Sequence, residues 1–375
     1  MDSNQFSSRP TRVKISLSAL KENFLAIQSL VAPAQVLCVV KANAFGHGIE
    51  ECSHALENSG ARWFGVALVE EGVLLRHSGI KSRILVFGGI YDAQVEQFIS
   101  NNLEITAPSA FKLTQINTVA SNLKIKAKVH LEFDSGLGRI GVRAESADSL
   151  IQAAKECSWC EIVGAYSHFA SADDPDSQSF TDNQIEKFAN IAKQVKEAFG
   201  EKTICHLSNS AGVSGQSKAR FDLVRPGLLL YGVNPGLNPA PLNLKPVLSL
   251  HSKVVYVKTV PANTPISYGG TWTSKETSRI VTLPLGYGDG YFRALSNKSS
   301  VLINGRRYPV VGRICMDQLM VNVGTDTVFN GNDVVLIGTQ GNESISAKEL
   351  ASLADTIPYE IFTNLNNRLP REYSA

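Results

Sequence analysis

One lysine stands at the end of an apolar run, where a charged side chain is costly. Residues 36–40 read Val-Leu-Cys-Val-Val, and Lys41 follows them directly with no acidic residue within several positions. A lone ammonium group is expensive to bury unless it is paired or loses its charge. A lysine that can lose its proton is suited to Schiff-base chemistry with a carbonyl group. Taken alone, a structural ion pair explains Lys41 equally well.

Other polar groups follow apolar runs further along the chain. They are Arg139 at the end of Asp134-Ser-Gly-Leu-Gly-Arg139, His168, the pair Asn209-Ser210, and Arg225, which is followed by Gly227 and Leu228. The Ser210 hydroxyl and the amides of Gly227 and Leu228 would form a phosphate cradle, since glycine allows close approach. Considered one at a time, His168 is typical of a hydrogen-bonded core histidine. Arg139 and Arg225 are each typical of an arginine in an ordinary salt bridge.

The elements that position these groups alternate between strand-like runs and segments of helical spacing. The runs cover 35–40, 63–67, 83–87, 103–106, 126–131, 162–167, 203–207 and 221–224. This alternation predicts an α/β fold, a (β/α)8 TIM barrel. The active site of such a barrel lies at the C-terminal ends of its strands, and the loops after strands seven and eight often hold a phosphate. The lysine, both arginines, His168 and the cradle would converge there, where pyridoxal phosphate would satisfy both the lysine and the cradle.

The composition changes after the eighth run. A connector rich in proline and asparagine, Asn234–Pro246, is followed by strand-like runs, and Asn304-Gly305 is a hairpin turn signal between two of them. The sequence therefore predicts a barrel domain over 1–246, which carries Lys41, and a mostly β domain over 247–375.

The bulk properties argue against several classes of partner. The 36 basic and 34 acidic residues give a net charge of +2 without any basic tract, which disfavours nucleic acid or a membrane surface. No apolar stretch approaches the length of a membrane span, and the N-terminus does not resemble a signal peptide. Six cysteines are then expected to be free thiols in a reducing cytoplasm. None of the seven histidines forms an HxH pair, so no metal site and no metal-dependent hydrolase is predicted.

The stretch VVKANAFGHG at 39–48 resembles the cofactor-lysine signature of bacterial alanine racemases. Further landmarks occur in the same order over nearly the whole chain, namely 134–139, Ser167–Ala170, Asn209–Ala211, Val224–Gly227, Ser267-Tyr268-Gly269, Gly286-Tyr287, Arg313–Asp317 and Tyr359-Glu360. The resemblance implies a barrel followed by a β domain, dependence on pyridoxal phosphate, and a homodimer with shared active sites. It also implies interconversion of L-alanine and D-alanine, as in D-alanine biosynthesis.

The resemblance also implies the catalytic roles. Lys41 would hold the cofactor covalently and serve as one acid–base group, and Tyr268 of the partner subunit would be the other. Racemisation needs a base on one face of the substrate Cα and an acid on the opposite face. His168 and Arg225, hydrogen-bonded in series, would assist the tyrosine. Arg225 would also face the pyridine nitrogen, which a guanidinium leaves unprotonated.

The binding roles follow from the same resemblance. Arg139 and the amide of the partner subunit's Met316 would bind the substrate carboxylate, and Tyr287 would line the entry of a pocket sized for alanine. Tyr359, Asn209 and Ser210, with the amides of Gly227 and Leu228, would hold the cofactor, while Cys315 and Asp317 would support the site from their shared motif.

Two residues depart from the family pattern. Phe45 stands where the family usually has a tyrosine whose hydroxyl reaches the phosphate, which predicts weaker cofactor retention. Glu132 stands where many members have a carbamylated lysine, and its carboxylate would orient Arg139 without modification. An outward-facing strand glutamate is the competing interpretation of Glu132.

Three other functions stay open at this stage. A non-catalytic pyridoxal phosphate carrier would share the barrel but lack the β domain and Tyr268. A decarboxylase of the same architecture would use a cysteine in the region of Cys315 as proton donor, but the glycine-triplet phosphate loop of that group is missing. A racemase acting on serine is the nearest alternative.

Overall fold

The computed structural model describes residues 8–235 and 242–375, which fold into two compact units. The barrel unit comprises Ala19–Ala44 and Ile49–Lys245. The β-rich unit comprises the chain up to Ser18, the short segment Phe45–Gly48, and Pro246–Ala375. Part of the predicted connector, Asn234–Pro246, lies outside the described residues.

The barrel unit is built on eight parallel strands, as predicted. They are β2 (Gln35–Val39), β3 (Trp63–Val66), β4 (Arg83–Val86), β5 (Glu104–Ala107), β6 (Ala127–Asp134), β8 (Cys160–Tyr166), β9 (Ile204–His206) and β10 (Leu223–Val224). Their order is β10-β2-β3-β4-β5-β6-β8-β9, and the two-residue strand β7 (Val142–Arg143) pairs with β6. Backbone hydrogen bonds from Asp222 to Cys205 and from Arg225 to Ser208 join the two ends of this order, so that the barrel is nearly closed.

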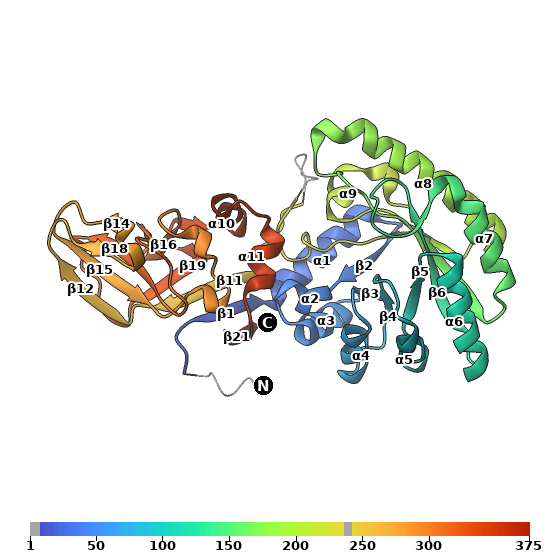
Figure 1. Ribbon diagram of the computed structural model, residues 1–375, viewed down its shortest axis with the longest axis horizontal. Helices are drawn as coiled ribbons and strands as arrows, with labels where there is room; N and C mark the ends of the chain where they lie inside the picture. The colour runs from blue at the N-terminus through green and yellow to red at the C-terminus, as the bar shows by residue number, and fades with distance from the viewer. Residues whose placement is uncertain (1–7, 236–241) are drawn as a thin grey trace. The chain divides into compact units, whose positions relative to one another are not determined.

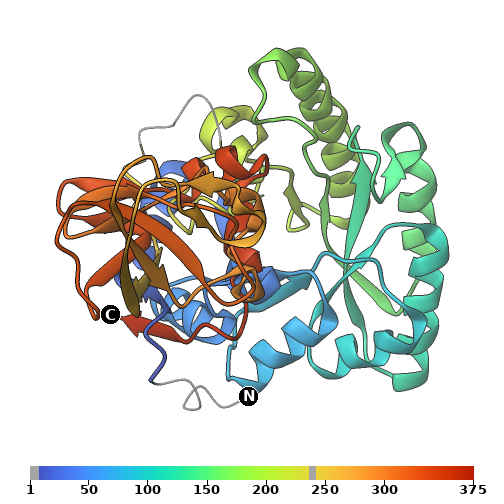
Figure 2. The same cartoon turned by 60° about the vertical axis from the view of Figure 1, so that its left-hand side comes forward.

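Helices surround these strands because each crossover between parallel strands returns outside the sheet. They are α1 (Leu17–Val31), α3 (Ile49–Asn58), α4 (Val69–His77), α5 (Val95–Ser100), α6 (Ala110–Leu123), α7 (Ala147–Glu156), α8 (Gln178–Phe199) and the short α9 (Ser210–Gly215). Figure 2 shows α4 to α8 on the outside of the strands. Leu20, Phe24 and Ile27 lie at helical spacing on one face of α1, and all three are buried.

The β-rich unit contains a larger sheet in the order β17-β16-β19-β11-β1-β21, with β20 on β19, a three-stranded sheet β12-β15-β18, and the pair β13-β14. The strands are β1 (Arg12–Ser16), β11 (Leu248–Lys253), β12 (Tyr256–Val260), β13 (Pro265–Ile266), β14 (Trp272–Thr273), β15 (Ser278–Leu283), β16 (Ser300–Ile303), β17 (Arg306–Pro309), β18 (Leu319–Gly324), β19 (Asp333–Gln340), β20 (Glu343–Ile345) and β21 (Arg371–Ser374). Asn304 and Gly305, both at positive φ, form the predicted hairpin turn between β16 and β17. Two short helices, α10 (Ala347–Ala354) and α11 (Pro358–Asn364), were not expected.

The N-terminal strand lies in the β-rich unit, whereas the sequence-based division assigned all of 1–246 to the barrel. β1 pairs antiparallel with β11 and parallel with β21, and its alternating residues Val13 and Ile15 are fully buried. The reason is long-range pairing. A five-residue alternating strand needs partners on both sides, and these partners come from the far end of the chain.

Candidate active site

Lys41 lies at the C-terminal end of the first barrel strand, and Arg139, His168, Ser210 and Arg225 follow four other strands at the same end. Burial, reinforced by the charge of Arg139, lowers the pKa of the Lys41 amine, and Glu71 opposes this effect. An amine with a lowered pKa holds more of its neutral form and is a better nucleophile. The lysine at this end of the barrel therefore has an amine of lowered pKa.

The backbone directly after Lys41 forms a left-handed turn, α2 (Lys41–Phe45). Ala42, Asn43 and Ala44 have φ values of 52°, 55° and 52°, and Phe45 has a φ of 52°. Left-handed helical geometry costs about 1–2 kcal/mol per residue that has a Cβ. Surrounding hydrogen bonds hold this turn, because the Ala42 amide donates to Glu71 Oε1 at 2.6 Å and the Asn43 side chain accepts from the Ile49 amide at 2.9 Å.

Glu71 is a residue that the sequence analysis missed. Its other carboxylate oxygen accepts the amides of Ala67 and Leu68 at the start of α4, at 2.8 and 3.1 Å. One carboxylate thus holds both a helix terminus and the turn beside the reactive lysine. The signal in the sequence is slight, since an acid in the first turn of a helix usually serves that helix alone.

Arg225 is buried, and both of its terminal nitrogens donate hydrogen bonds. One of its terminal nitrogens donates to His206 Nδ1 at 2.7 Å, and the other donates to the Ser167 carbonyl at 2.7 Å and to His168 Nδ1 at 3.2 Å. Burial lowers the pKa of Arg225 to about 10, so the guanidinium keeps its charge at neutral pH. Burial, with the charge of Arg225, lowers the pKa of His168 well below its ordinary value. The His168 ring is therefore neutral and carries its proton on Nε2, because Nδ1 accepts from the arginine.

At the predicted phosphate cradle, the structure has a cluster of amides around one hydroxyl. Ser210 Oγ accepts the amide of Gly227 at 2.9 Å and that of Leu229 at 3.4 Å, and all three residues are buried. The Gly227 amide contacts the Ser210 hydroxyl as expected. The second amide in contact with that hydroxyl belongs to Leu229, whereas the sequence analysis named Leu228. Asn209 caps α9, where its side chain accepts the Gly212 amide at 3.0 Å. Convergent amides and a hydroxyl are the donor set that a phosphate group needs, so these residues fit the phosphate end of the cofactor.

Glu132 points into the protein and is only 2% exposed, so the outward-facing interpretation is wrong. Burial raises the pKa of its carboxyl to about 7, although the Tyr166 hydroxyl and the charges of Arg139 and Arg225 act in the opposite direction. One carboxylate oxygen, Oε2, has no hydrogen-bond partner among the described residues. Glu132 is therefore a buried acid beside two arginines, in a position to act on Arg139.

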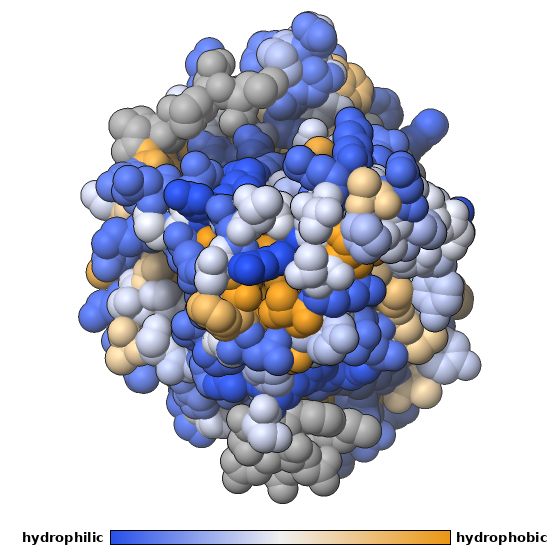
Figure 3. All heavy atoms as spheres, turned by 90° about the vertical axis from the view of Figure 1, so that its left-hand side faces the viewer, coloured by the Kyte–Doolittle hydropathy of each residue, from blue (hydrophilic) through white to orange (hydrophobic). Residues whose placement is uncertain are grey.

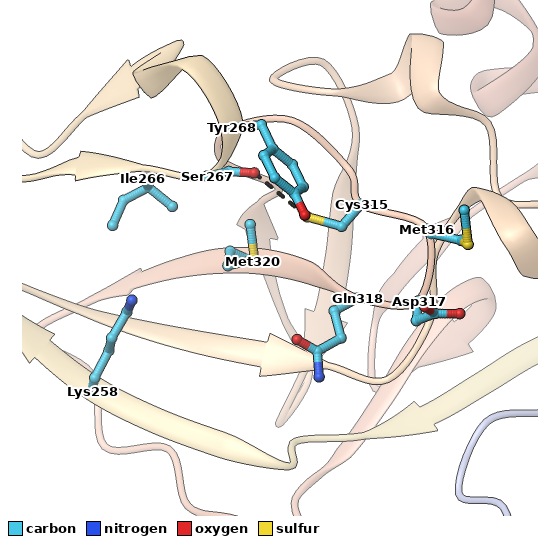
Figure 4. Close-up of a pocket in the computed structure, with 9 residues that line it drawn as sticks. All are labelled: Lys258, Ile266, Ser267, Tyr268, Cys315, Met316, Asp317, Gln318 and Met320. Atoms are coloured by element: carbon cyan, nitrogen blue, oxygen red, sulfur yellow. Dashed lines mark hydrogen bonds between the residues drawn. The ribbon is translucent and has the colours of Figure 1, made fainter.

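Within the β-rich unit, Tyr268 lines an open hollow of about 550 Å³ together with Ser267, Cys315, Met316 and Asp317 (Figure 4). Ser267, at a φ of 66°, donates to the Arg313 carbonyl at 2.6 Å and contacts Cys315 Sγ at 3.6 Å. These contacts fix the backbone beside Tyr268. The tyrosine side chain itself is 70% exposed.

The other predicted residues of this unit gather beside the hollow. The amide of Tyr287 donates to the Cys315 carbonyl at 3.0 Å, and Asp317 forms an ion pair with Arg368 at 2.6 Å. Tyr287 and Met316 are 42% and 54% exposed. Tyr359 lies elsewhere in the unit, on α11, where its ring contacts that of the buried Phe45 with centroids 5.7 Å apart.

Large apolar side chains are exposed on the β-rich unit. Figure 3 shows apolar residues gathered in a central area with hydrophilic residues around it, on the side that Figure 1 has at its left. The exposed large residues of the unit are Val255, Tyr256, Tyr268, Tyr287, Met316, Phe329 and Ile357. An exposed group of this kind is typical of a surface that a partner covers.

Two features have no candidate among the described residues. In residues 8–235 and 242–375, no three histidine, cysteine or acidic side chains are arranged to hold a metal ion. No helix within those ranges has the length and apolar character needed to cross a membrane. The six cysteines are free.

The barrel and the β-rich unit, with a reactive lysine on the first and an exposed tyrosine on the second, define an enzyme of the class that contains amino-acid racemases and decarboxylases. The family model for the alanine racemase N-terminal domain matches residues 15–235, and that for the C-terminal domain matches 247–373. The chain belongs to the alanine racemase family. The carrier and decarboxylase alternatives are thereby set aside, because both domains match those of racemases.

Individual relatives agree with this assignment. The alanine racemase of Carboxydothermus hydrogenoformans is 42% identical over 97% of this chain and 100% of its own. The crystal structure of alanine racemase from Streptomyces lavendulae superposes with a TM-score of 0.93 at 31% identity, over 98% of this chain and 97% of that one. Alanine racemase from Bartonella henselae, with covalently bound pyridoxal phosphate, superposes with a TM-score of 0.89 at 29% identity, over 97% of this chain and 99% of that one.

Proposed function

We propose that this enzyme interconverts L-alanine and D-alanine, with pyridoxal phosphate bound covalently at Lys41. The observation that carries the proposal is the lysine amine of lowered pKa at the mouth of the barrel, at the same barrel end as a neutral His168 and a charged Arg225. The covalent cofactor in the Bartonella henselae relative supports it. When bound, pyridoxal phosphate withdraws electrons from the amino acid and makes its Cα–H acidic.

Several residues of this chain are proposed to hold the cofactor. Ser210 and the amides of Gly227 and Leu229 form the donor cluster for its phosphate, with Leu228, Asn209 and Tyr359 as further contacts from the family resemblance. Arg225 would face the pyridine nitrogen. Since its guanidinium is held by four acceptors and keeps its proton, it would donate to that nitrogen without protonating it.

Two groups would move the Cα proton. Lys41 would act on one face of the substrate, and Tyr268 of the partner subunit would act on the other. The 70% exposure of Tyr268 in a single chain, and the exposed Met316 that lines the same hollow, support completion of the site by a second copy. His168, with its Nε2 proton, would stabilise the charge that forms on the tyrosine oxygen.

The substrate carboxylate would bind to Arg139 and to the amide of the partner subunit's Met316. Glu132 would orient Arg139 through its charge, as a carbamylated lysine does in the family pattern. Tyr287 would restrict the pocket to a small side chain, and Cys315 and Asp317 would support the loop that carries Met316, the latter through its ion pair with Arg368.

The decisive experiment mixes purified protein with pyridoxal phosphate and L-alanine and follows optical rotation. Loss of rotation that is absent in Lys41→Ala is the expected result. A parallel reaction with L-serine measures the preference for the smaller side chain. Faster racemisation of serine would reject alanine as the substrate, and release of carbon dioxide from the amino acid would reject racemisation.

A further inference from the structure

Five polar side chains form a continuous chain of contacts through the interior of the barrel. Arg83 pairs with Glu104 Oε1, and Glu104 Oε2 contacts His130 Nε2 at 2.7 Å. His130 Nδ1 lies 3.1 Å from His206 Nε2, and His206 Nδ1 lies 2.7 Å from the guanidinium of Arg225. We refer to these residues as the relay. Glu104, His130, His206 and Arg225 are each at most 3% exposed.

The relay crosses the barrel from one end to the other. Arg83 and Glu104 are the first residues of β4 and β5, His130 lies within β6, His206 is the last residue of β9, and Arg225 directly follows β10. Barrel interiors are normally filled by branched apolar side chains. Buried polar groups are costly unless each one is paired, so an unbroken chain of them indicates a function beyond filling space.

The protons along the relay have only one consistent arrangement. A guanidinium can only donate, so His206 Nδ1 must accept from Arg225. A neutral His206 then carries its proton on Nε2 and donates it to His130 Nδ1. His130 therefore carries its proton on Nε2 and donates it to the Glu104 carboxylate. A positively charged His130 does not fit, because its Nδ1 proton would face the Nε2 proton of His206.

The charges of the relay agree with this arrangement. Burial, with the charge of Arg225, lowers the pKa of His206 well below its ordinary value, so this histidine is neutral. Although burial alone would raise the pKa of Glu104, its hydrogen bonds to His130 and Arg83 and the charge of Arg83 hold this pKa below its ordinary value. Arg83 also lies over the Trp63 ring, 3.7 Å from its centroid, which fixes the far end of the relay.

We infer that Glu104 is a positioning residue for Arg225: its carboxylate sets the tautomers of His130 and His206 and so keeps an acceptor facing the guanidinium. This inference rests on the proposed function in one respect, namely that Arg225 faces the pyridine nitrogen of the cofactor. A guanidinium held in this way keeps a fixed position at the barrel end, from which it would donate to that nitrogen.

The variant Glu104→Gln should reverse the relay. Its amide oxygen would turn to the positive charge of Arg83, and its NH2 group would then face His130. His130 and His206 would both have to move their protons to Nδ1, which places an N–H of His206 against the N–H of Arg225. In the double variant Arg83→Leu/Glu104→Gln the amide is free to turn its oxygen to His130, so the original tautomers should return.

The primary readout is 15N NMR of the histidine rings in the holoenzyme at neutral pH. The wild-type protein should show His130 and His206 as neutral rings protonated on Nε2, the single variant should show Nδ1 protonation, and the double variant should show Nε2 again. An imidazolium or an Nδ1 proton on either ring in the wild type overturns the inference without any variant. Unchanged tautomers in a folded Glu104→Gln protein also overturn it.

The second readout is functional. Glu104→Gln should lower kcat by roughly tenfold or more, the effect of donors left facing each other in the interior, with little change in KM for alanine because Arg139 is untouched. The exposed barrel-strand variant Glu161→Gln is the matched control and should change neither value. The tautomer measurement does not depend on turnover. The activity assay with Lys41→Ala tests the racemase proposal, and the tautomer measurement tests the relay. A failure of one can therefore be distinguished from a failure of the other.

Discussion

The carboxylate of Glu71 accepts the backbone N–H of Ala42 at 2.6 Å, and through its second oxygen it also accepts two amides at the start of α4. Ala42 is the first residue of the left-handed turn that follows Lys41. A backbone conformation that disfavours residues with a Cβ persists only where its surroundings hold it. Glu71 is therefore part of what fixes the direction of the reactive lysine.

We expect Glu71→Ala to destabilise the protein and to lower the pKa of Lys41 further. Three backbone N–H groups lose their acceptor in this variant. If water takes over some of these hydrogen bonds, the free energy of unfolding should fall by about 1–3 kcal/mol in total. Glu71 raises the pKa of Lys41 in the native protein, whereas burial and the charge of Arg139 lower it. Without Glu71, only the two lowering effects remain. Thermal unfolding measures the first effect, and the pH dependence of pyridoxal phosphate addition to the apoprotein measures the second. The neighbouring exposed variant Glu70→Ala should show neither, and an unshifted pH profile in Glu71→Ala would contradict the assignment.

The variant Phe45→Tyr should retain the cofactor more tightly. Phe45 is 4% exposed and its ring lies against that of Tyr359, a proposed phosphate ligand. A hydroxyl that gains one hydrogen bond to the phosphate contributes about 0.5–1.5 kcal/mol, or up to roughly tenfold in affinity. Cofactor release during dialysis, followed by absorbance, measures it. Tyr359→Phe is the matched opposite change and should weaken retention. Equal retention by wild type and Phe45→Tyr would show that position 45 does not reach the phosphate.

Glu132 should make substrate binding depend on pH near neutrality. Burial raises the pKa of its carboxyl to about 7, so Glu132 loses its charge as the pH falls through that value. If its charge orients Arg139, KM for alanine should rise as the pH falls from 8 to 6. In Glu132→Gln, KM should be higher at pH 8 and should lose this pH dependence. A variant with wild-type KM across the range would remove Glu132 from the site.

The same carboxyl predicts a stability difference with a definite sign. The pKa of Glu132 is higher in the folded protein than in the unfolded chain, where it is about 4.3. Between these two values the folded state binds more protons, so its stability falls as the pH rises. The Glu132→Gln variant has no such titrating group and does not lose stability in this way. The difference between its free energy of unfolding and that of the wild type should therefore increase from pH 5 to pH 8. Urea unfolding at the two pH values measures the difference, and a constant offset would contradict a raised pKa.

The proposed sharing of active sites between subunits predicts complementation between two inactive variants. Lys41→Ala and Tyr268→Phe should each lose nearly all activity, since each removes one of the two proposed acid–base groups. After the two proteins are mixed at equal concentration and allowed to exchange subunits, half of the dimers contain both chains, and each of these has one intact site. About a quarter of wild-type activity should return. No recovery in a mixture shown to contain mixed dimers would place Tyr268 and Lys41 of the same chain in one site.

The barrel was predictable because its signals are local. Each strand is a short apolar run, and the polar residue that follows a run has to lie at the C-terminal end of the barrel, as Lys41 and Arg225 do. The hairpin at Asn304-Gly305 is equally local. The placement of β1 was not predictable in this way, since its partners lie more than 200 residues away.

The missed features depend on conformation or on distant partners. No glycine occupies positions 42–45, so the sequence gives no sign of a left-handed turn there. His130, His206 and Glu104 are single polar residues within or beside apolar runs, and only their registers across neighbouring strands bring them into one line. The role of Tyr268 came from the resemblance, because an exposed tyrosine in a single chain has no physical mark of catalysis.

The segment Phe45–Gly48 belongs to the β-rich unit although barrel residues flank it on both sides. Gly46 meets the Phe362 carbonyl so closely that an added Cβ would lie 2.3 Å from it, and Arg371 donates to the Gly46 carbonyl at 2.7 Å. The gene therefore has no point at which a cut would separate the two units cleanly. A barrel taken by recombination from another lineage would bring its own four residues, which would have to suit the recipient's α11 and β21. Inheritance of the two units is therefore tied together by a segment of only four residues.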